Sequence, residues 1–354
     1  MKIAVLVSGG VDSAVALNLL KEQGHDLTAY YLKIWLEDEL AYLGQCPWDE
    51  DLAFVRAVCE QAGVPLKIIT LQKEYYDRVV GYAITEIQAG RTPNPDIFCN
   101  KRVKFGSFFD HIDASYDAVA TGHYAHIMHE NGIFKLATAP DTIKDQTYFL
   151  SGLSQEQLSR IVFPLGKLTK KEVRQLAQAY NLANKDRKDS QGICFLGKIK
   201  FRDFIKHNVG TQAGVIIELE TGATLGEHEG FWFYTIGQRS GLGLAGGPWY
   251  VVSKDPQKNI VFISRNYYTD DKLRDTVLIA QFNPTAGMNL QEIAQLSDLK
   301  VKLRHGPHMV DCAIASCDAD RAIIKLSEHD QGIAPGQFAV LYSGNICLGG
   351  GVIE

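Results

Sequence analysis

The sequence lacks Cys-x-x-Cys pairs, although it contains seven cysteines in 354 residues. An odd number of thiols without that spacing argues against a disulfide framework and against a zinc ribbon. The sequence also lacks an uninterrupted apolar run long enough to span a membrane, and its first apolar stretch, residues 3–7, is too short for a signal peptide. We therefore expect a cytoplasmic enzyme with no membrane contact, in which each thiol is judged by its own surroundings.

The chain has no overall positive charge either. Its net charge is −5 at neutral pH, which disfavours indiscriminate binding to nucleic acid. Its 46% apolar and 22% charged residues are ordinary for a folded protein of two or three domains. Positive charge is concentrated between Arg160 and Lys206, where twelve basic residues stand against four acidic ones. This stretch is either a solvated helical face or a surface for nucleic-acid phosphates.

The most informative motif is Ser-Gly-Gly-Val-Asp-Ser at residues 8–13, between a short apolar run and the helical pattern of residues 14–20. A strand, a glycine turn and a helix in this order form a phosphate-binding loop, because glycine amides and the helix N-terminus both point at the anion. Ser8 and Ser13 would add hydroxyl donors, whereas Asp12 would face Mg²⁺ or cap the helix. The alternative is an ordinary turn with Asp12 or Ser13 as the N-cap.

The pattern of elements changes near residue 200. Strand-like and helical runs alternate up to about Asn184, which predicts a parallel sheet with helices on both faces and ligands at the carboxyl ends of the strands. After the helical run 201–207, short β patterns predict two small antiparallel barrels. We expect domains at 1–200, 201–275 and 276–354. Asn131-Gly132 predicts a hairpin inserted on the parallel sheet.

Two cysteines have surroundings that favour chemistry over packing. Cys99 stands at the expected start of a helix, with three cations in the next five residues, and both features favour the thiolate. Cys194 follows a basic run in a glycine-containing loop, so neither thiol is expected in a core. Four others are interpreted as small buried hydrophobic residues, and Cys46 stays undecided; the four are Cys59, Cys312, Cys317 and Cys347.

Together, the motifs resemble the bacterial tRNA-specific 2-thiouridylase family of the ATP-pyrophosphatase superfamily. The resemblance covers nearly the whole chain, and the family often has Met where Leu32 stands and Tyr where His305 stands. It is carried by residues 8–13, 94–100 (Asn-Pro-Asp-Ile-Phe-Cys-Asn), 120–124 (Ala-Thr-Gly-His-Tyr), 144–146 (Lys-Asp-Gln), 190–195 (Ser-Gln-Gly-Ile-Cys-Phe), 235–239 (Thr-Ile-Gly-Gln-Arg) and 241–243 (Gly-Leu-Gly).

The resemblance implies an N-terminal domain of the adenine-nucleotide α-hydrolase type, followed by two β-rich domains. It implies that ATP, with Mg²⁺, adenylylates the C2 oxygen of the wobble uridine of tRNA, with AMP and pyrophosphate released. Cys194 would carry a persulfide received from a cysteine desulfurase or a sulfur-relay protein. Cys99 would be the second thiol, attacking the persulfide to leave a disulfide with Cys194, and Asp96 would handle protons. The substrates would be the tRNAs for Lys, Glu and Gln.

The same resemblance implies two sets of contact residues and no metal site built by the protein alone. ATP would be bound by Leu6, Val7, Ser8, Gly9, Gly10, Val11, Asp12, Ser13, Leu32 and Gly122. The tRNA, with its target base flipped out of the stack, would be bound by Asn94, Pro95, Asp96, Lys144, Asp145, Gln146, Arg304 and His305.

Three other functions remain open from the sequence. Amide or C–N bond formation, as in argininosuccinate synthetase or GMP synthetase, uses the same loop but needs no thiols. An iron–sulfur-dependent thiolase is disfavoured by the cysteine spacing. A tRNA-binding module without catalysis would bind tRNA without cleaving ATP.

Overall fold

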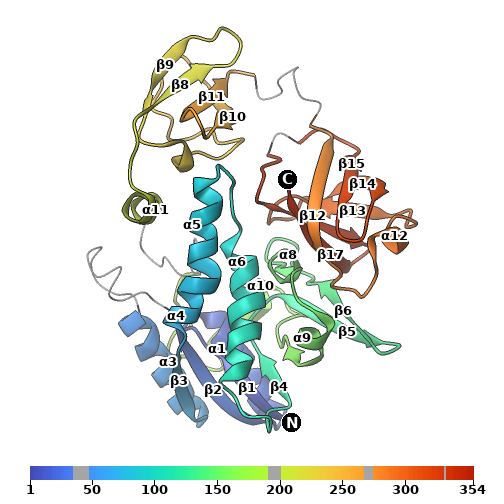
Figure 1. Ribbon diagram of the computed structural model, residues 1–354. Coiled ribbons are helices and arrows are strands. Elements are labelled where there is room, and N and C mark those ends of the chain that lie inside the picture. Colours follow the sequence, from blue (N-terminus) through green and yellow to red (C-terminus); the bar gives the residue numbers. More distant parts are fainter. Residues whose placement is uncertain (35–47, 190–200, 267–273, 331) are drawn as a thin grey trace.

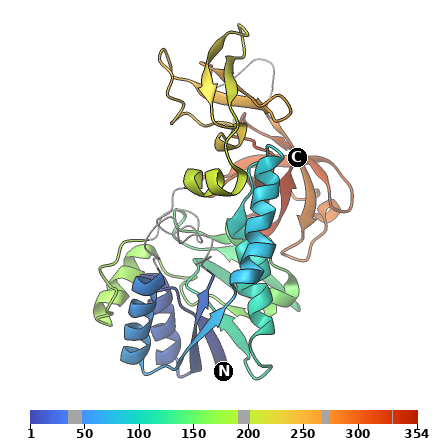
Figure 2. The ribbon, with the colours of Figure 1, turned by 60° about the vertical axis from the view of Figure 1, so that its left-hand side comes forward.

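The computed structural model describes residues 1–34, 48–189, 201–266, 274–330 and 332–354. Figure 1 shows a mixed α/β unit at the N-terminal end, a small β unit at the opposite end of the molecule, and a third β unit that packs beside the first. The same three parts can be followed in a second view (Figure 2). Among the helices of the described ranges, none is both long and apolar enough to cross a membrane.

The N-terminal unit is built on a five-stranded sheet in which every pairing is parallel, as the sequence predicts. Its order is β3-β2-β1-β4-β7. The strands are β1 (Lys2–Leu6), β2 (Asp26–Lys33), β3 (Leu66–Thr70), β4 (Ala118–Ala120) and β7 (Ile161–Val162). The chain first adds strands on one side of β1 and then on the other. The sheet edge at the carboxyl ends of β1 and β4 is therefore the position where sheets of this topology bind ligands.

Helices cover both faces of this sheet because β1 is apolar and buried from Ile3 to Leu6. Ile3 and Val5 enter one core, together with apolar residues of α1 (Val11–Glu22), α3 (Trp48–Ala62) and α10 (Lys170–Ala179). Ala4 and Leu6 enter the opposite core. Successive side chains of a strand point to opposite faces, so an unbroken apolar strand requires a cover on each side.

The opposite core is covered by a chain of short helical segments. They are α4 (Gln72–Tyr75), η2 (Tyr76–Val80), α5 (Gly81–Gln88), α6 (Pro95–Phe98), the π-helical segment η3 (Cys99–Ser107) and α7 (Phe108–Asp110). Two further short helices, α8 (Thr147–Leu150) and α9 (Gln155–Ser159), follow the hairpin described below. This core also contains Phe338 and Val340 of the C-terminal unit, so the two units share one apolar interior.

The central unit is a four-stranded sheet with its own small core. Its order is β10-β11-β8-β9, and α11 (Phe201–Val209) precedes it. The strands are β8 (Gly214–Glu218), β9 (Thr224–His228), β10 (Tyr250–Asp255) and β11 (Ile260–Ser264), with a short 3₁₀ turn, η4 (Phe231–Phe233), between β9 and β10. The β11–β8 pairing is parallel, whereas the sequence predicts antiparallel pairing throughout. The long connection after β9 allows the second hairpin to return alongside β8 in the same direction.

The C-terminal unit is a closed six-stranded barrel. Strand β12 pairs with both β15 and β17, which closes the sheet, and every pairing is antiparallel. The strands are β12 (Thr276–Asn283), β13 (Leu299–Lys302), β14 (Val310–Cys317), β15 (Ala322–Leu326), β16 (Phe338–Ser343) and β17 (Ile346–Ile353), and α12 (Leu290–Ile293) follows β12. Closure pairs the first and last strands of this sheet with each other, so the barrel lacks the long free edges of an open sheet.

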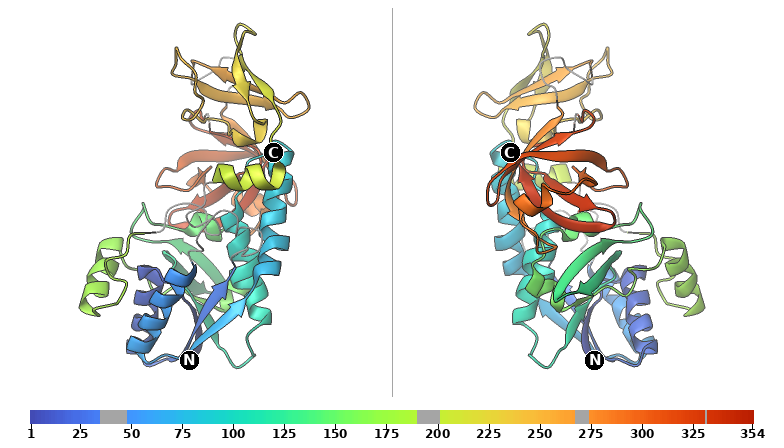
Figure 3. Two further views of the ribbon diagram at one scale, coloured as in Figure 1. Left: turned by 90° about the vertical axis from the view of Figure 1, so that its left-hand side faces the viewer. Right: turned by 90° about the vertical axis from the view of Figure 1, so that its right-hand side faces the viewer.

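The predicted hairpin forms, but not on the parallel sheet. Asn131 and Gly132 both have positive φ, at 51° and 79°, and connect β5 (Ala125–Glu130) to β6 (Ile133–Thr138). Strand β6 pairs with β17, so the hairpin extends the sheet of the C-terminal barrel. The right-hand panel of Figure 3 shows these strands lying against the barrel. The turn residues predict a hairpin, but they carry no information about which edge it joins.

A buried ion pair joins the two units next to this hairpin. Lys302 Nζ lies 2.8 Å from Asp145 Oδ2, and the two side chains are 2% and 1% exposed. Asp145 also accepts hydrogen bonds from the Thr147 hydroxyl, at 2.8 Å, and from the Ala139 amide, at 3.2 Å. Every oxygen of this carboxylate therefore has a partner, as a buried charge requires.

Removing one partner of this pair should destabilise the whole protein. In Lys302→Met the Asp145 carboxylate would stay buried without its counter-ion, and we expect the free energy of unfolding to fall by about 3–5 kcal/mol. Urea denaturation measures the loss. The matched control is Lys300→Met on the same strand, whose exposed pair with Asp311 should contribute about 1 kcal/mol or less. Equal losses in the two variants would show that the buried pair has no special role.

Candidate functional site

The phosphate-binding loop predicted at residues 8–13 lies at the carboxyl end of β1, beside β4. Gly9 is buried with φ at +78°, a conformation that glycine adopts without strain. Gly10 is the N-cap of α1, in an extended conformation, and no side chain caps the helix. Neither Asp12 nor Ser13 is therefore the N-cap that the alternative predicts. The first N–H groups of α1 remain directed at the loop, as in an anion site.

Ser13 has a different role from the predicted phosphate donor. Its hydroxyl donates to the Gly10 carbonyl at 3.0 Å and accepts from the Ser8 amide at 3.2 Å, and the residue is 7% exposed. In this structure the Ser13 hydroxyl stabilises the loop by hydrogen bonds to its backbone. Ser8, in contrast, is exposed and can reach a ligand.

Gly122 lies against the first turn of α1. A Cβ at this position would come within 2.7 Å of the Ser13 amide nitrogen and 2.8 Å of the Asp12 carbonyl carbon. The loop after β4 and the N-terminus of α1 therefore touch through backbone atoms. Leu32 is near the carboxyl end of β2, the strand next to β1. The strand ends thus bring the predicted ATP residues to one edge of the sheet.

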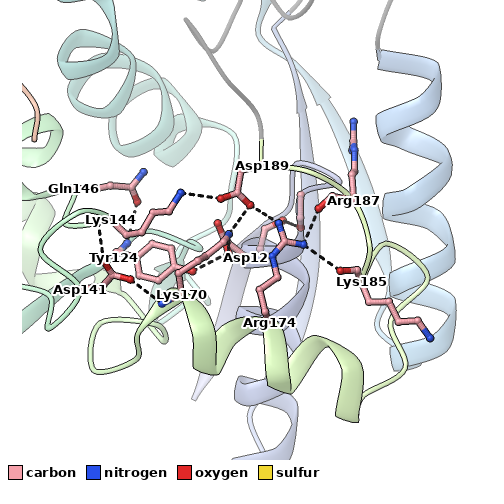
Figure 4. A network of polar contacts seen from close by, with 12 residues as sticks. Asp12, Tyr124, Asp141, Lys144, Gln146, Lys170, Arg174, Lys185, Arg187 and Asp189 are labelled. Atoms are coloured by element: carbon pink, nitrogen blue, oxygen red, sulfur yellow. Dashed lines mark hydrogen bonds and ion pairs between the residues drawn. The ribbon is translucent and has the colours of Figure 1, made fainter.

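Asp12 does not cap α1, and its carboxylate has partners within the protein. Its Oδ1 accepts hydrogen bonds from the Tyr124 hydroxyl at 2.9 Å and from Lys170 Nζ at 2.7 Å (Figure 4). Burial and the neighbouring Asp12 carboxylate raise the pKa of Tyr124, so its phenol stays protonated and donates. Lys170, at the start of α10, places a cation beside the phosphate loop.

Asp189 is the centre of the same polar network. Its Oδ1 lies 2.8 Å from Lys170 Nζ and 2.5 Å from Arg174 Nη2, and its Oδ2 lies 2.8 Å from Lys144 Nζ (Figure 4). Burial acts to raise the pKa of Asp189, but hydrogen bonds from Lys144 and Lys170 outweigh it and hold the pKa well below its ordinary value. Asp189 is thus a carboxylate shared by three cations.

The residues just before Asp189 lie over the loop itself. The Gly9 carbonyl accepts hydrogen bonds from Asn184 Nδ2 at 2.9 Å and from Arg187 Nη1 at 3.0 Å. Arg187 also forms an ion pair with Asp51 of α3. The chain that leads toward residue 190 is therefore attached to the backbone of the phosphate loop.

Cys99 is placed differently from the prediction. Asn94 caps the helix through the Ile97 amide, Pro95 occupies the first turn, and Cys99 begins the π-helical segment η3. The residue is 1% exposed and belongs to the same core as Leu6 at the end of β1. The expectation that Cys99 lies outside a core is wrong, because Cys99 packs in a core that residues from distant parts of the chain also enter, Phe338 of the barrel among them, and a single sequence does not reveal that packing. Cys194 and Cys46 lie outside the described residues.

The three cations that follow Cys99 have partners elsewhere. Lys101 Nζ donates to Asn283 Oδ1 of the barrel at 3.1 Å, and burial lowers its pKa. Arg102 lies over the ring of Phe98 and donates to a backbone carbonyl of η2. Lys104 donates to the Asn100 side chain at 3.2 Å. These contacts attach the helix to its surroundings.

The other cysteines agree only in part with their prediction. Cys59 and Cys347 are buried, and burial raises the pKa of the Cys59 thiol to about 11. Cys312 and Cys317 are only half-buried, because β14 exposes one face of the barrel to solvent.

The predicted tRNA residues fall into a buried group and an accessible group. Asn94, Pro95 and Asp145 are buried, and Asp145 is engaged by Lys302, so none of these three side chains faces outward in this structure. Asp96, Lys144 and Gln146 are half-buried, and Gln146 accepts from the Tyr124 amide at 3.0 Å. Arg304 and His305 are exposed, and the imidazole of His305 stacks on Phe149 at 4.6 Å.

The basic stretch is partly neutralised within the molecule. Lys170 and Arg174 pair with Asp189, Arg187 pairs with Asp51, and both Arg202 and Lys206 pair with Glu229. Fewer cations are therefore available to a bound polyanion than the net charge of the stretch suggests.

Sequence reasoning missed the network around Asp12. The sequence assigns no role to Tyr124 of the 120–124 motif, and it places Lys170 and Asp189 only among the basic and acidic residues between Arg160 and Lys206. The available signal was the position of Asp189, directly before the motif at 190–195. Pairings between residues 12, 144, 170 and 189 depend on how the sheet brings its loops together, which residue spacing does not reveal.

Comparisons with known proteins agree over the full length of the chain. Family models described as a tRNA methyl transferase HUP domain, a tRNA methyl transferase PRC-barrel domain and an aminomethyltransferase beta-barrel domain match residues 1–198, 202–265 and 277–353. The tRNA-specific 2-thiouridylase MnmA of Parabacteroides distasonis is 43% identical, with 100% of this chain and 99% of that protein covered. The tRNA-specific 2-thiouridylase MnmA 2 of Bacteroides fragilis (strain ATCC 25285) is 44% identical, with both chains covered completely.

A solved structure that matches part of the chain is more distant in sequence. A 4-thiouridine synthetase in complex with RNA and bound ATP has a TM-score of 0.33 and 16% identity, over 56% of this chain and 45% of that one.

Proposed function

The chain belongs to the family of tRNA-specific 2-thiouridylases, and we propose that it adenylylates the C2 oxygen of the wobble uridine of tRNA and then replaces that oxygen with sulfur. The observation that carries the first step is the uncapped N-terminus of α1 behind Gly9 and Gly10, with the Lys170 ammonium beside it. Amides and a cation at one place suit a polyphosphate.

The residues of this loop also fit ATP with Mg²⁺. In the described ranges, no three His, Cys, Asp or Glu side chains converge as a metal cage. Mg²⁺ is commonly held by one or two carboxylates together with phosphate oxygens, and the Asp12 carboxylate could supply one such ligand. When bound, the ion would neutralise the leaving pyrophosphate. Lys170 would hold phosphate oxygens, and the backbone of residues 8–13 would orient them for attack at the α-phosphate.

The second step needs two thiols. The Cys194 persulfide, supplied by a cysteine desulfurase or a sulfur-relay protein, is attacked at its inner sulfur by the Cys99 thiolate. This attack forms a Cys99–Cys194 disulfide and releases hydrosulfide, which adds to C2 and expels AMP. A thiol reductant then restores both cysteines, and Asp96 would move the protons. Thiolates are the reactive form in every such exchange.

The burial of Cys99 adds a condition to this scheme. At 1% exposure, its sulfur cannot meet a base from solvent in the conformation described here. We propose that tRNA binding moves α6, with Cys99 at its C-terminal end, relative to the barrel unit, whose Gln337 side chain donates to the Thr92 carbonyl at 3.0 Å. A flipped uracil would then reach both the thiol and the phosphate loop.

One reconstitution tests the proposed function. The protein is incubated in the presence of ATP, cysteine, a cysteine desulfurase and tRNA for Lys, Glu or Gln, and the nucleosides are analysed by mass spectrometry. We expect 2-thiouridine at the wobble position and one AMP for each sulfur inserted. Absence of 2-thiouridine, or AMP formed together with a new C–N bond, would contradict the proposal. Such a protein would act in the cytoplasm, where its substrates are found.

A further inference from the structure

One carboxylate connects the loop that is proposed to bind phosphate with the loop that is proposed to bind tRNA. Asp189 holds Lys170 through Oδ1 and Lys144 through Oδ2, both at 2.8 Å. Lys170 in turn holds Asp12 in the first turn of α1, and Lys144 belongs to the segment that follows β6. Figure 4 shows these side chains as one continuous network between the two loops.

The number of donors on each ammonium group leaves room for substrates. A lysine ammonium has three N–H donors. Two donors of Lys170 are accounted for by Asp12 and Asp189, and one donor of Lys144 by Asp189. A phosphate oxygen of ATP can therefore join Lys170, and an RNA phosphate can join Lys144, while both keep their bonds to Asp189.

The side chains of the network are also sheltered enough for the contacts to matter. Lys170 is 14% exposed, Asp189 is 25% exposed and Lys144 is 35% exposed. Arg174 adds a third cation to Asp189 from the next turn of α10. Salt screens partly buried ion pairs less than exposed ones. A charge bound near Lys170 therefore acts electrostatically on Lys144.

We propose that Asp189 is a positioning residue through which ATP and tRNA bind cooperatively, and this inference rests on the proposed function. ATP would fix Lys170, Lys170 would fix Asp189, and Asp189 would hold Lys144 in the place where it meets RNA. The ordering of Lys144 would then already have occurred when tRNA arrives, which produces positive cooperativity. The coupling must be equal in both directions.

The test is a binding cycle with the full-length protein, a non-hydrolysable ATP analogue and unmodified tRNA for Glu. We expect the analogue to tighten tRNA binding by about tenfold, and tRNA to tighten binding of the analogue by the same factor. In Asp189→Asn this factor should approach one, because the amide cannot accept from both lysines. The affinity for each ligand alone should change by a smaller factor than the coupling.

Two further variants complete the test. Asp186→Asn is the matched control, since Asp186 lies three residues earlier, is exposed and accepts only from Gln178 in the contacts described. It should keep the full coupling. Lys144→Gln removes the ion pair with Asp189 on the tRNA side of the network and should also lose the coupling. This variant replaces Asp189→Asn in the test if Asp189→Asn does not fold.

The failures of the two proposals can be told apart. Wild-type protein that forms 2-thiouridine but shows no coupling, or coupling retained in both Asp189→Asn and Lys144→Gln, would overturn the role of Asp189 alone. Wild-type protein that forms no 2-thiouridine would overturn the proposed function.

Discussion

Cys99→Ser is expected to lower the rate of uridine thiolation by about 10⁴-fold or more, the loss typical when a nucleophile is removed. Serine keeps the shape of the side chain, but its hydroxyl is not ionised near neutral pH and cannot attack a persulfide. Pyrophosphate release should continue up to one equivalent, because the phosphate loop is unchanged. Thiolated nucleoside and pyrophosphate are measured in the same single-turnover reaction.

The control for Cys99→Ser is Cys59→Ser. Cys59 is also buried, at 3% exposure, but it lies in the core on the opposite side of the sheet. Each substitution buries a hydroxyl, with a comparable cost of about 1–3 kcal/mol if the hydroxyl finds no partner. The two variants should therefore lose similar stability, whereas only Cys99→Ser should lose thiolation. Wild-type thiolation by Cys99→Ser would remove the second thiol from the mechanism.

Gly122→Ala is expected to lower kcat/KM for ATP by about 100-fold, the effect of misplacing reacting groups by about 1 Å. The new Cβ would lie 2.7 Å from the Ser13 amide nitrogen, and because that atom belongs to the backbone, the first turn of α1 must move. The amides that face the phosphates would move with it. Pyrophosphate release at varied ATP concentration in the presence of tRNA measures the effect.

Gly81→Ala is the matched control for this substitution. Gly81 begins α5 with a helical φ, and the nearest atom to its new Cβ is the Tyr76 carbonyl oxygen at 3.5 Å, an ordinary contact. We expect unchanged kcat/KM and a stability gain of about 0.4–1 kcal/mol, because alanine restricts the unfolded chain. A Gly122→Ala protein as active as Gly81→Ala would show that Gly122 does not set the position of α1.

The sequence predicts the parallel sheet well because the apolar runs at β1 and β4 are short and unbroken. Gly9 and Gly10 could be placed at a strand–helix junction for the same local reason. The turn of the hairpin at Asn131-Gly132 is predictable from the sequence, but its pairing is not. Its turn follows from two residues with positive φ, whereas its pairing with β17 depends on contacts more than 200 residues away in the chain.

The least predictable features are those created by the packing of units against one another. The cationic neighbours of Cys99 predict an exposed thiolate. In the structure, however, Cys99 lies in a core that also contains Phe338 and Val340 of the barrel strand β16. The sequence motif predicts that Asp145 contacts tRNA. In the structure its carboxylate is instead paired with Lys302, which is 157 residues away in the chain. Interactions at such separations leave no periodic signal in a single sequence.

The most direct test of the central claim follows the fate of one oxygen atom. A tRNA for Glu is prepared with ¹⁸O at the C2 position of the wobble uridine and is thiolated by the protein with unlabelled ATP. If the uracil oxygen attacks the α-phosphate, that oxygen leaves C2 within AMP, and every AMP formed should carry one ¹⁸O. Unlabelled AMP formed alongside 2-thiouridine would contradict adenylylation of the base.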